Sequence, residues 1–272
     1  GTIGGTCVNV GCIPSKNLIR ATESWHQAKA ANRFLGIRGD AGRTDWRAGM
    51  AQKDEIVTDL RQGKYIDVLP SYNNIAYIEG PVGLGVDVIA VNGEKMEAGK
   101  IVITTGASPA VPSIPGIEDV SFLTSTTALE LEKLPDTLLV IGGGYIGMEL
   151  GSGYVKLGSN VVVVEALETI LPGADADLRR LVERKAKREF RDIRVGSRVL
   201  SIMTKGSQIQ ARVASGDDDP VEELYDRVLV SVGRVPNTED LGLENTEAEL
   251  DERGFVRVDS GRRTGDPTIS AI

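Results

Sequence analysis

Residues 138–147 of this sequence read Leu138-Leu139-Val140-Ile141-Gly142-Gly143-Gly144-Tyr145-Ile146-Gly147. The apolar residues predict a buried strand, the glycines fit the pattern G-x-G-x-x-G, and a helical pattern continues over residues 145–156. In such a loop Gly142 permits a tight turn, Gly144 lets a pyrophosphate approach the backbone, and Gly147 lets the helix pack on the strand. The stretch therefore predicts a phosphate-binding turn at the start of a helix.

A second apolar run over residues 161–165 ends on Glu165. This is about the 20-residue spacing at which dinucleotide-binding units place an acid on the adenosine ribose. A carboxylate there would repel a 2′-phosphate, so the sequence favours NADH over NADPH. A purely structural glycine turn is the alternative, but strand, helix and acid together favour a dinucleotide site.

The segments that follow alternate between helix and strand patterns. A charged helix is expected over residues 176–188, and strands over 199–203, 209–213 and 228–232. This order predicts an α/β fold with a Rossmann-type unit and an added antiparallel piece.

The segments before and after this unit have patterns of their own. Helical spacing runs over residues 14–31, and again from a cap at Thr44 or Asp45 to a stop at Pro70. Strands are expected over residues 75–79, 86–91 and 101–104, with a hairpin turn at Asn92-Gly93, and later over 255–259 and 267–272. Closely spaced prolines place a boundary near Gly116. We therefore expect domains at residues 1–116, 117–237 and 238–272.

The only two cysteines of the chain lie in the run GGTCVNVGCIPSK, residues 4–16. A disulfide between Cys7 and Cys12 would close too short a loop to add much stability. Pro14 suits the first position of a helix, which would place Cys12 where free N–H groups and the helix dipole favour a thiolate. The pair therefore predicts a redox site, with two buried small hydrophobic residues as the alternative.

The run 4–16 resembles the redox-disulfide motif of the flavoprotein disulfide reductases, among them mercuric reductase, dihydrolipoamide dehydrogenase and glutathione reductase. The resemblance implies a glutathione-reductase-like fold of two Rossmann-like domains, one for FAD and one for NAD(P), in a homodimeric enzyme. It implies that Lys16 lies beside the flavin and is held by Glu149, and that Tyr145 covers the nicotinamide pocket. The implied contacts to FAD are Gly4, Gly5, Thr6, Lys16, Thr105 and Gly106, and those to NAD(P) are Gly142, Gly144, Tyr145, Ile146, Gly147, Glu165 and Gly233.

Within this family the sequence indicates more than one candidate substrate. The first half is most similar to mercuric reductases, in which Cys7 and Cys12 would hold Hg(II) transiently. Residues 161–173 are more similar to dihydrolipoamide dehydrogenase, the second candidate, and a non-catalytic redox sensor or remnant is a third. His26, the only histidine, is expected on a helix surface, and a metal site of Cys7, Cys12 and His26 is disfavoured.

Composition and charge narrow the kinds of partner and the cellular location that we expect. The net charge of −8 argues against nucleic acid or an anionic membrane as a partner. With no apolar stretch of membrane-spanning length, we expect a cytoplasmic enzyme that acts on a small molecule or ion. The chain begins inside a motif and lacks the family's first glycine loop and its Gly-Asp pair, so we expect a fragment, truncated at both ends.

Overall fold

The computed structural model describes residues 1–42, 45–85 and 88–272. It divides the chain into two compact units. The larger unit contains Thr2–Tyr65 and Pro109–Gly233, and the smaller unit contains Gly1, Ile66–Ser108 and Arg234–Ile272.

A four-stranded parallel sheet forms the centre of the larger unit. Its order is β12-β6-β7-β8, with β6 at Thr137–Ile141, β7 at Asn160–Val164, β8 at Asp192–Arg194 and β12 at Arg227–Val230. The first strand of the unit thus lies between the last and the second, as in a Rossmann sheet. The apolar runs of β6 and β7 are continuous because both faces of these strands are covered.

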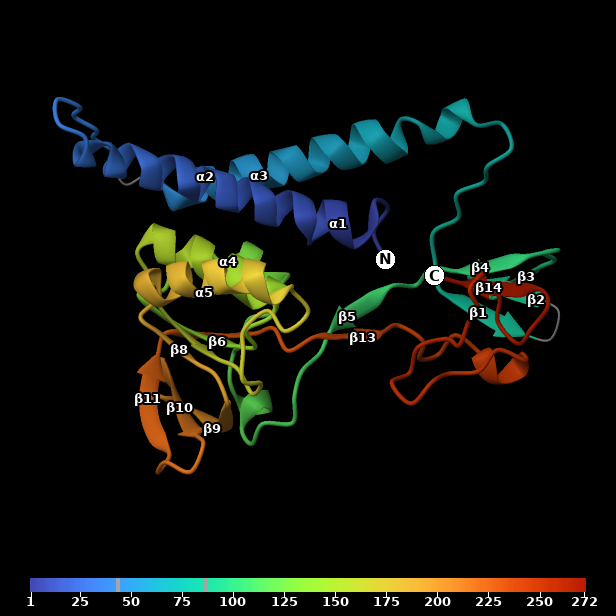
Figure 1. The fold of residues 1–272 in the computed structure, drawn as a ribbon. Coiled ribbons are helices and arrows are strands. Elements are labelled where there is room, and N and C mark those ends of the chain that lie inside the picture. The colour runs from blue at the N-terminus through green and yellow to red at the C-terminus, as the bar shows by residue number, and fades with distance from the viewer. Residues whose placement is uncertain (43–44, 86–87) are drawn as a thin grey trace. The chain divides into compact units, whose positions relative to one another are not determined.

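One layer covers each face of this sheet (Figure 1). Helices α4 (Tyr145–Leu157) and α5 (Ala176–Glu189) lie on one face, and an antiparallel sheet lies on the other. That sheet has the order β11-β10-β9, with β9 at Ser197–Lys205, β10 at Gln208–Ser215 and β11 at Val221–Tyr225. The predicted Rossmann-type unit with an antiparallel piece is confirmed.

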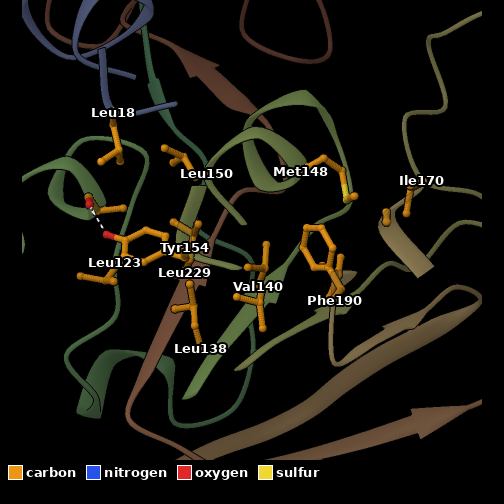
Figure 2. Packing of buried hydrophobic residues seen from close by; sticks show 14 of the residues in the cluster. Leu18, Leu123, Leu138, Val140, Met148, Leu150, Tyr154, Ile170, Phe190 and Leu229 are labelled. Atoms are coloured by element: carbon orange, nitrogen blue, oxygen red, sulfur yellow. Dashed lines mark hydrogen bonds between the residues drawn. The ribbon is translucent and has the colours of Figure 1, made fainter. Parts of the chain in front are cut away.

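The core on the helical side joins this sheet to the N-terminal helices. Side chains of β6, α4 and α2 meet there, including Leu138, Leu150 and Leu18 (Figure 2). Tyr154 is fully buried among them, and its hydroxyl donates a hydrogen bond to the Ala128 carbonyl. Because this bond satisfies the phenol, the ring can lie in an apolar core.

The N-terminal segment of the larger unit is helical, with α1 at Gly5–Asn9, α2 at Cys12–Ala30 and α3 at Trp46–Arg61. Helix α2 begins at Cys12, so the expectation that Pro14 takes its first position is wrong; the proline is tolerated because its ring lies within the first turn. Asp45 caps α3 by accepting a hydrogen bond from the Arg47 N–H at 2.9 Å. The alternative cap, Thr44, lies outside the described residues.

Helix α3 ends before the proline that was expected to stop it. A π-helical turn at Gln62–Ile66 follows Arg61, and Pro70 lies in a separate 3-10 turn at Leu69–Ser71. Further 3-10 turns occur at Ala31–Arg33, Ile117–Asp119, Thr127–Leu129 and Leu243–Asn245.

The strands described in the smaller unit are short. An antiparallel sheet has the order β1-β2-β3, with β1 at Val82–Gly85, β2 at Val88–Val91 and β3 at Glu94–Met96. The predicted hairpin turn is confirmed, because Asn92 and Gly93 both have positive φ, 53° and 81°. Val86, the predicted start of the strand, lies outside the described residues. Strand β4 (Ile101–Ile103) pairs in parallel with β14 (Ile269–Ala271), and β5 (Ala107–Pro109) pairs with β13 (Arg234–Pro236).

Two predicted strands are wrong. Residues 75–79 are exposed and form no ladder within the described chain, and residues 255–259 contribute only the Leu250–Val256 bridge. Alternation and β-branched residues make a segment able to pair, but a strand also needs a partner edge. The predicted domain ranges remain a prediction; the compact units group the N-terminal helices with the Rossmann-type sheet because α2 packs on α4.

Candidate functional site

The glycine loop turns sharply at the carboxyl end of β6. Gly142 has a φ of 105°, which favours glycine, and a Cβ there would lie 2.6 Å from the Ser231 carbonyl oxygen. A methyl group at Gly147 would overlap the Gly142 carbonyl oxygen. The first position therefore needs glycine for its turn, and the last needs it for close packing of α4 against the loop.

A cleft of about 690 Å³ opens above this loop. It lies at the carboxyl ends of the parallel strands, where open α/β sheets bind their ligands. Nearly all of the residues expected to contact NAD(P) line it: Gly142, Gly144, Tyr145, Ile146, Glu165 and Gly233. Gly147 is buried at the start of α4 and does not line it.

Glu165 forms part of the cleft wall and is 9% exposed. Its Oε2 accepts a hydrogen bond from the Gly143 N–H at 2.7 Å, and its Oε1 accepts one from the Leu167 N–H at 2.8 Å. The carboxylate therefore holds the glycine loop as well as facing the cleft. Each oxygen keeps acceptor capacity for a ribose hydroxyl.

Tyr145 is the first residue of α4 and is 58% exposed. Its hydroxyl lies beside Gly173, where a Cβ would be 3.3 Å from the oxygen. The ring thus stands at the edge of the cleft and is not packed in the core, so it can contact a ligand there.

The two thiols lie at the junction of α1 and α2. Cys7 belongs to α1, Cys12 is the first residue of α2, and both are exposed. Hydrogen bonding with the Cys12 side chain raises the pKa of Cys7, and burial and the nearby Cys12 charge raise it further. Gly11 allows the close turn, since a Cβ there would lie 2.8 Å from the Thr6 carbonyl oxygen. The fold thus brings the two sulfurs close enough to interact.

Lys16 and Glu149 connect the thiol helix to the helix of the glycine loop. Lys16 Nζ lies 2.7 Å from Oε1 and 2.6 Å from Oε2 of Glu149. The side chains are 57% and 44% exposed, so the ion pair is not buried. Because Glu149 lies in the second turn of α4, the pair links the thiol site to the helix that begins at the cleft.

The residues expected to contact FAD fall in both units. Gly4, Gly5 and Thr6 lie beside Cys7 in the larger unit, while Thr105 and Gly106 lie in the smaller unit. There Asn237 donates its side-chain N–H to the Thr105 carbonyl and its backbone N–H to the Gly106 carbonyl, both at 2.9 Å. Asn237 thus holds the backbone of Thr105 and Gly106 in place, a role that the sequence did not predict.

Other sequence expectations concern residues outside these sites. His26 is exposed on α2. Across residues 1–42, 45–85 and 88–272, the side chains of His, Cys, Asp and Glu form no group of three that could hold a metal ion. None of the helices in that part of the chain is both long enough and apolar enough to cross a membrane.

Comparison with known proteins places this geometry in a family. The family model described as pyridine nucleotide-disulphide oxidoreductase matches residues 2–272. A mercuric reductase of Lysinibacillus sphaericus is 37% identical over 100% of this chain and 49% of that protein. A mitochondrial dihydrolipoyl dehydrogenase of Pisum sativum is 35% identical over 100% of this chain and 55% of that protein.

The solved structures give the same fold. The HOCl-induced flavoprotein disulfide reductase RclA of Escherichia coli, in its Cu(II) complex, aligns with a TM-score of 0.84 at 31% identity. The alignment covers 100% of this chain and 57% of that one. The chain thus spans about half the length of the curated relatives it matches.

Proposed function

This chain belongs to the pyridine nucleotide-disulphide oxidoreductase family, and we propose that the protein uses NAD(P)H and FAD to reduce the Cys7–Cys12 pair, with Hg(II) as the final electron acceptor. The observation that carries the proposal is the placement of two interacting thiols at the junction of α1 and α2. Cys12, the first residue of α2, lies about one helical turn from Lys16, which is paired with Glu149 on the helix of the glycine loop.

The residues present fit a pyridine dinucleotide. No atom lies within 4 Å of the position of a Cβ on Gly144, so the backbone at the start of α4 is open to a pyrophosphate. Glu165 would hold the adenosine ribose, and Tyr145 and Gly233 would lie on the nicotinamide side. On this basis we propose NADH as the preferred donor.

The residues also fit FAD. The Cβ positions of Gly5 and Gly106 are likewise open, and Cys12 and Lys16 are exposed. Bound FAD would supply a two-electron carrier between the nicotinamide and the sulfur atoms. Lys16, held by Glu149, would place a positive charge beside the ring.

Reduction of the Cys7–Cys12 disulfide consumes two electrons and releases two thiolates, which take up protons according to their pKa values. Cys12 and Lys16 are four residues apart on α2 and therefore lie on one face of the helix. The positive charge of Lys16 lowers the pKa of Cys7, although Cys12 and burial outweigh it. Lys16 thus assists the thiolate form that binds metal ions and attacks disulfides.

Hg(II) is the favoured acceptor because a pair of thiolates is a good ligand set for a soft metal ion. The overall reaction balances: NAD(P)H and Hg(II) give NAD(P)⁺, a proton and Hg(0). Similarity to the mercuric reductase at 37% identity supports this assignment. A homodimer in the cytoplasm is part of the same proposal.

Dihydrolipoamide is the second candidate substrate. Its support is Glu165 at the end of β7, which suits an NAD-linked enzyme, and the similarity to a dihydrolipoyl dehydrogenase. In that reaction a thiolate of dihydrolipoamide would attack Cys7 in the Cys7–Cys12 disulfide and release Cys12, and the second substrate thiol would then displace Cys7 and leave lipoamide as the oxidised product. Cys12 would face the flavin, which takes up the two electrons. The two reactions use the same pair of sulfurs.

The test uses the natural protein that contains this sequence. Oxidation of NADH and NADPH is followed with Hg(II), and reduction of NAD⁺ with dihydrolipoamide. We expect Hg(II) to be the better substrate, and Cys7→Ser and Cys12→Ser each to lower activity at least about a hundredfold. His26→Gln, an exposed change on α2, is the control. Turnover of dihydrolipoamide alone would replace the mercury proposal, and full activity in both cysteine variants would refute the redox site.

A further inference from the structure

One positively charged side chain in the proposed dinucleotide cleft has no role in the function proposed above. Arg198 lines the cleft together with Glu165, and these are the two side chains of opposite full charge among its described lining residues. Arg198 is the second residue of β9, in the antiparallel sheet. The sequence did not point to Arg198, because a helix and a strand (α5 and β8) separate it from Glu165 along the chain.

The backbone before Arg198 is tied to the strand end that carries Glu165. The Ser197 N–H donates to the Glu165 carbonyl at 2.9 Å. The Ser197 side chain is buried, and its hydroxyl lies 2.7 Å from that of Ser215 and 3.0 Å from the Val195 carbonyl oxygen. Arg198 is therefore held beside the adenosine end of the cleft, although its own side chain is exposed.

The arginine side chains in this region differ in how many ionic partners they have. Arg191 and Arg194 both reach Glu223, and Arg194 also pairs with Asp192. Arg198 makes no ion pair or side-chain hydrogen bond with any residue that the structure describes. Glu165, in contrast, already accepts two backbone hydrogen bonds. At the same end of the cleft, the carboxylate of Glu165 is thus held by two backbone hydrogen bonds, while the guanidinium of Arg198 has no partner among the described residues.

We infer that Arg198 is a specificity-determining residue that binds the 2′-phosphate of NADPH. The inference rests on the proposed use of this cleft for a nicotinamide dinucleotide. A guanidinium near the ribose can accommodate a 2′-phosphate through charge-assisted hydrogen bonds. Arg198 would offset the repulsion from Glu165, so that the cleft accepts both NADH and NADPH.

The test is binding of NADH and NADPH to the natural protein, measured by calorimetry after its flavin and disulfide have been fully reduced with dithionite, so that no hydride is transferred during the titration. We expect Arg198→Gln to raise the Kd for NADPH about tenfold and the Kd for NADH less than about twofold. Arg198→Lys should lose less NADPH affinity than Arg198→Gln, because it keeps the charge. Arg212→Gln is the matched control, since Arg212 is exposed on β10 of the same sheet and does not line the cleft.

The results distinguish a wrong role for Arg198 from a wrong function for the cleft. A steeper salt dependence for NADPH than for NADH, lost in Arg198→Gln, would support the inference. Equal weakening of both dinucleotides would overturn it, because it would assign Arg198 to a group that they share. Unchanged binding in Arg198→Gln would also overturn it while leaving the cleft intact. Failure of the wild-type protein to bind either dinucleotide would refute the proposed function itself.

Discussion

At the scale of single residues, the thiol pair shows how the fold sets reactivity. Cys7 and Cys12 are both exposed, so burial alone cannot make them inert. Their mutual interaction matters more, because hydrogen bonding with Cys12 is the largest cause of the raised pKa of Cys7. In the reduced protein the Cys12 side chain therefore raises the pH at which Cys7 forms its thiolate.

We predict that Cys12→Ala lowers the pKa of Cys7 toward its ordinary value of 9.0. The substitution removes both the hydrogen bond and the like charge that disfavour the Cys7 thiolate, and only one thiol remains to be titrated. The measurement is the rate of alkylation by iodoacetamide against pH in the reduced protein, with peptide mapping to follow Cys7 in the wild type. A midpoint that stays where it is in the wild type would contradict the assignment.

The sequence revealed the residue types of these sites but not all of their contacts. The glycine pattern and the acid at the end of the second strand were enough to predict a dinucleotide cleft. The hydrogen bonds from Gly143 and Leu167 to Glu165 depend on how the loop curls back over β7, which spacing does not encode. Arg198 was missed for a similar reason, since only the pairing of sheets brings β9 beside Glu165.

At the scale of elements, α4 shows that glycines in one helix have different roles. Gly147 lies against the Gly142 carbonyl and the Ser231 hydroxyl, whereas a Cβ on Gly153 would meet no atom within 4 Å. Helix propensity favours alanine at both positions by the same amount. Packing alone distinguishes them.

We predict that Gly147→Ala lowers the free energy of unfolding by about 1–3 kcal/mol, because the loop or the helix must shift. Gly153→Ala, the matched control, should raise it by roughly 0.5–1 kcal/mol. Urea unfolding of the two variants gives both values, and NADH titration should show weaker binding in the first variant only. Equal effects of the two substitutions would mean that close packing at the loop is not needed.

A second element-level feature is the ion-pair network between β8 and β11. Arg194 Nη2 lies 2.9 Å from Glu223 Oε2, and the Tyr225 hydroxyl donates to the same oxygen at 2.6 Å. Burial by itself would raise the pKa of Glu223, but the hydrogen bonds from Arg194 and Tyr225 outweigh it and hold the pKa below 4.5. The network joins the edge of the parallel sheet to the antiparallel sheet.

Because the pKa of Glu223 is lowered in the folded protein, its contribution to stability is present above 4.5 and is lost as the pH falls through the folded value. We predict that Glu223→Gln lowers the free energy of unfolding by about 1–3 kcal/mol at neutral pH, with a smaller loss in acid. Urea unfolding at both pH values tests this, with exposed Glu222→Gln as the control. A loss that is independent of pH would show that the charge of Glu223 is not what stabilises the junction.

Secondary-structure elements were predicted correctly where an apolar sequence pattern coincides with a neighbouring strand to pair with. Three strands of the Rossmann-type sheet, β6, β7 and β12, were predicted within one or two residues, because continuous apolar runs indicate strands covered on both faces. The fourth strand, β8, was missed because its single apolar residue, Ile193, lies between two charged residues. Strand β11 was missed because Glu222 and Glu223 interrupt its apolar pattern, and its pairing with β10 depends on the network around Arg194. Residues 75–79 show the converse, a strand-like pattern without a paired edge.

At the scale of the whole molecule, the two proposed cofactors would make different demands on this chain. The cleft proposed for the dinucleotide lies entirely within the larger unit, because all of its described lining residues belong to that unit. The expected FAD contacts are divided between the two units. The sequence contains one G-x-G-x-x-G loop, at residues 142–147, and Gly142 and Gly144 of that loop line this cleft.

We therefore predict that these 272 residues, expressed alone, bind NADH weakly, do not bind FAD in stoichiometric amounts, and reduce neither Hg(II) nor lipoamide. A flavin-binding Rossmann unit needs its own glycine loop for the pyrophosphate, and the relatives are about twice as long as this chain. Calorimetric titration with NADH and with FAD is the measurement, and Gly147→Ala is the variant that should weaken the NADH signal. Stoichiometric FAD binding would contradict this prediction. It would mean that Gly5, Lys16 and Gly106 suffice to hold the flavin without a second glycine loop.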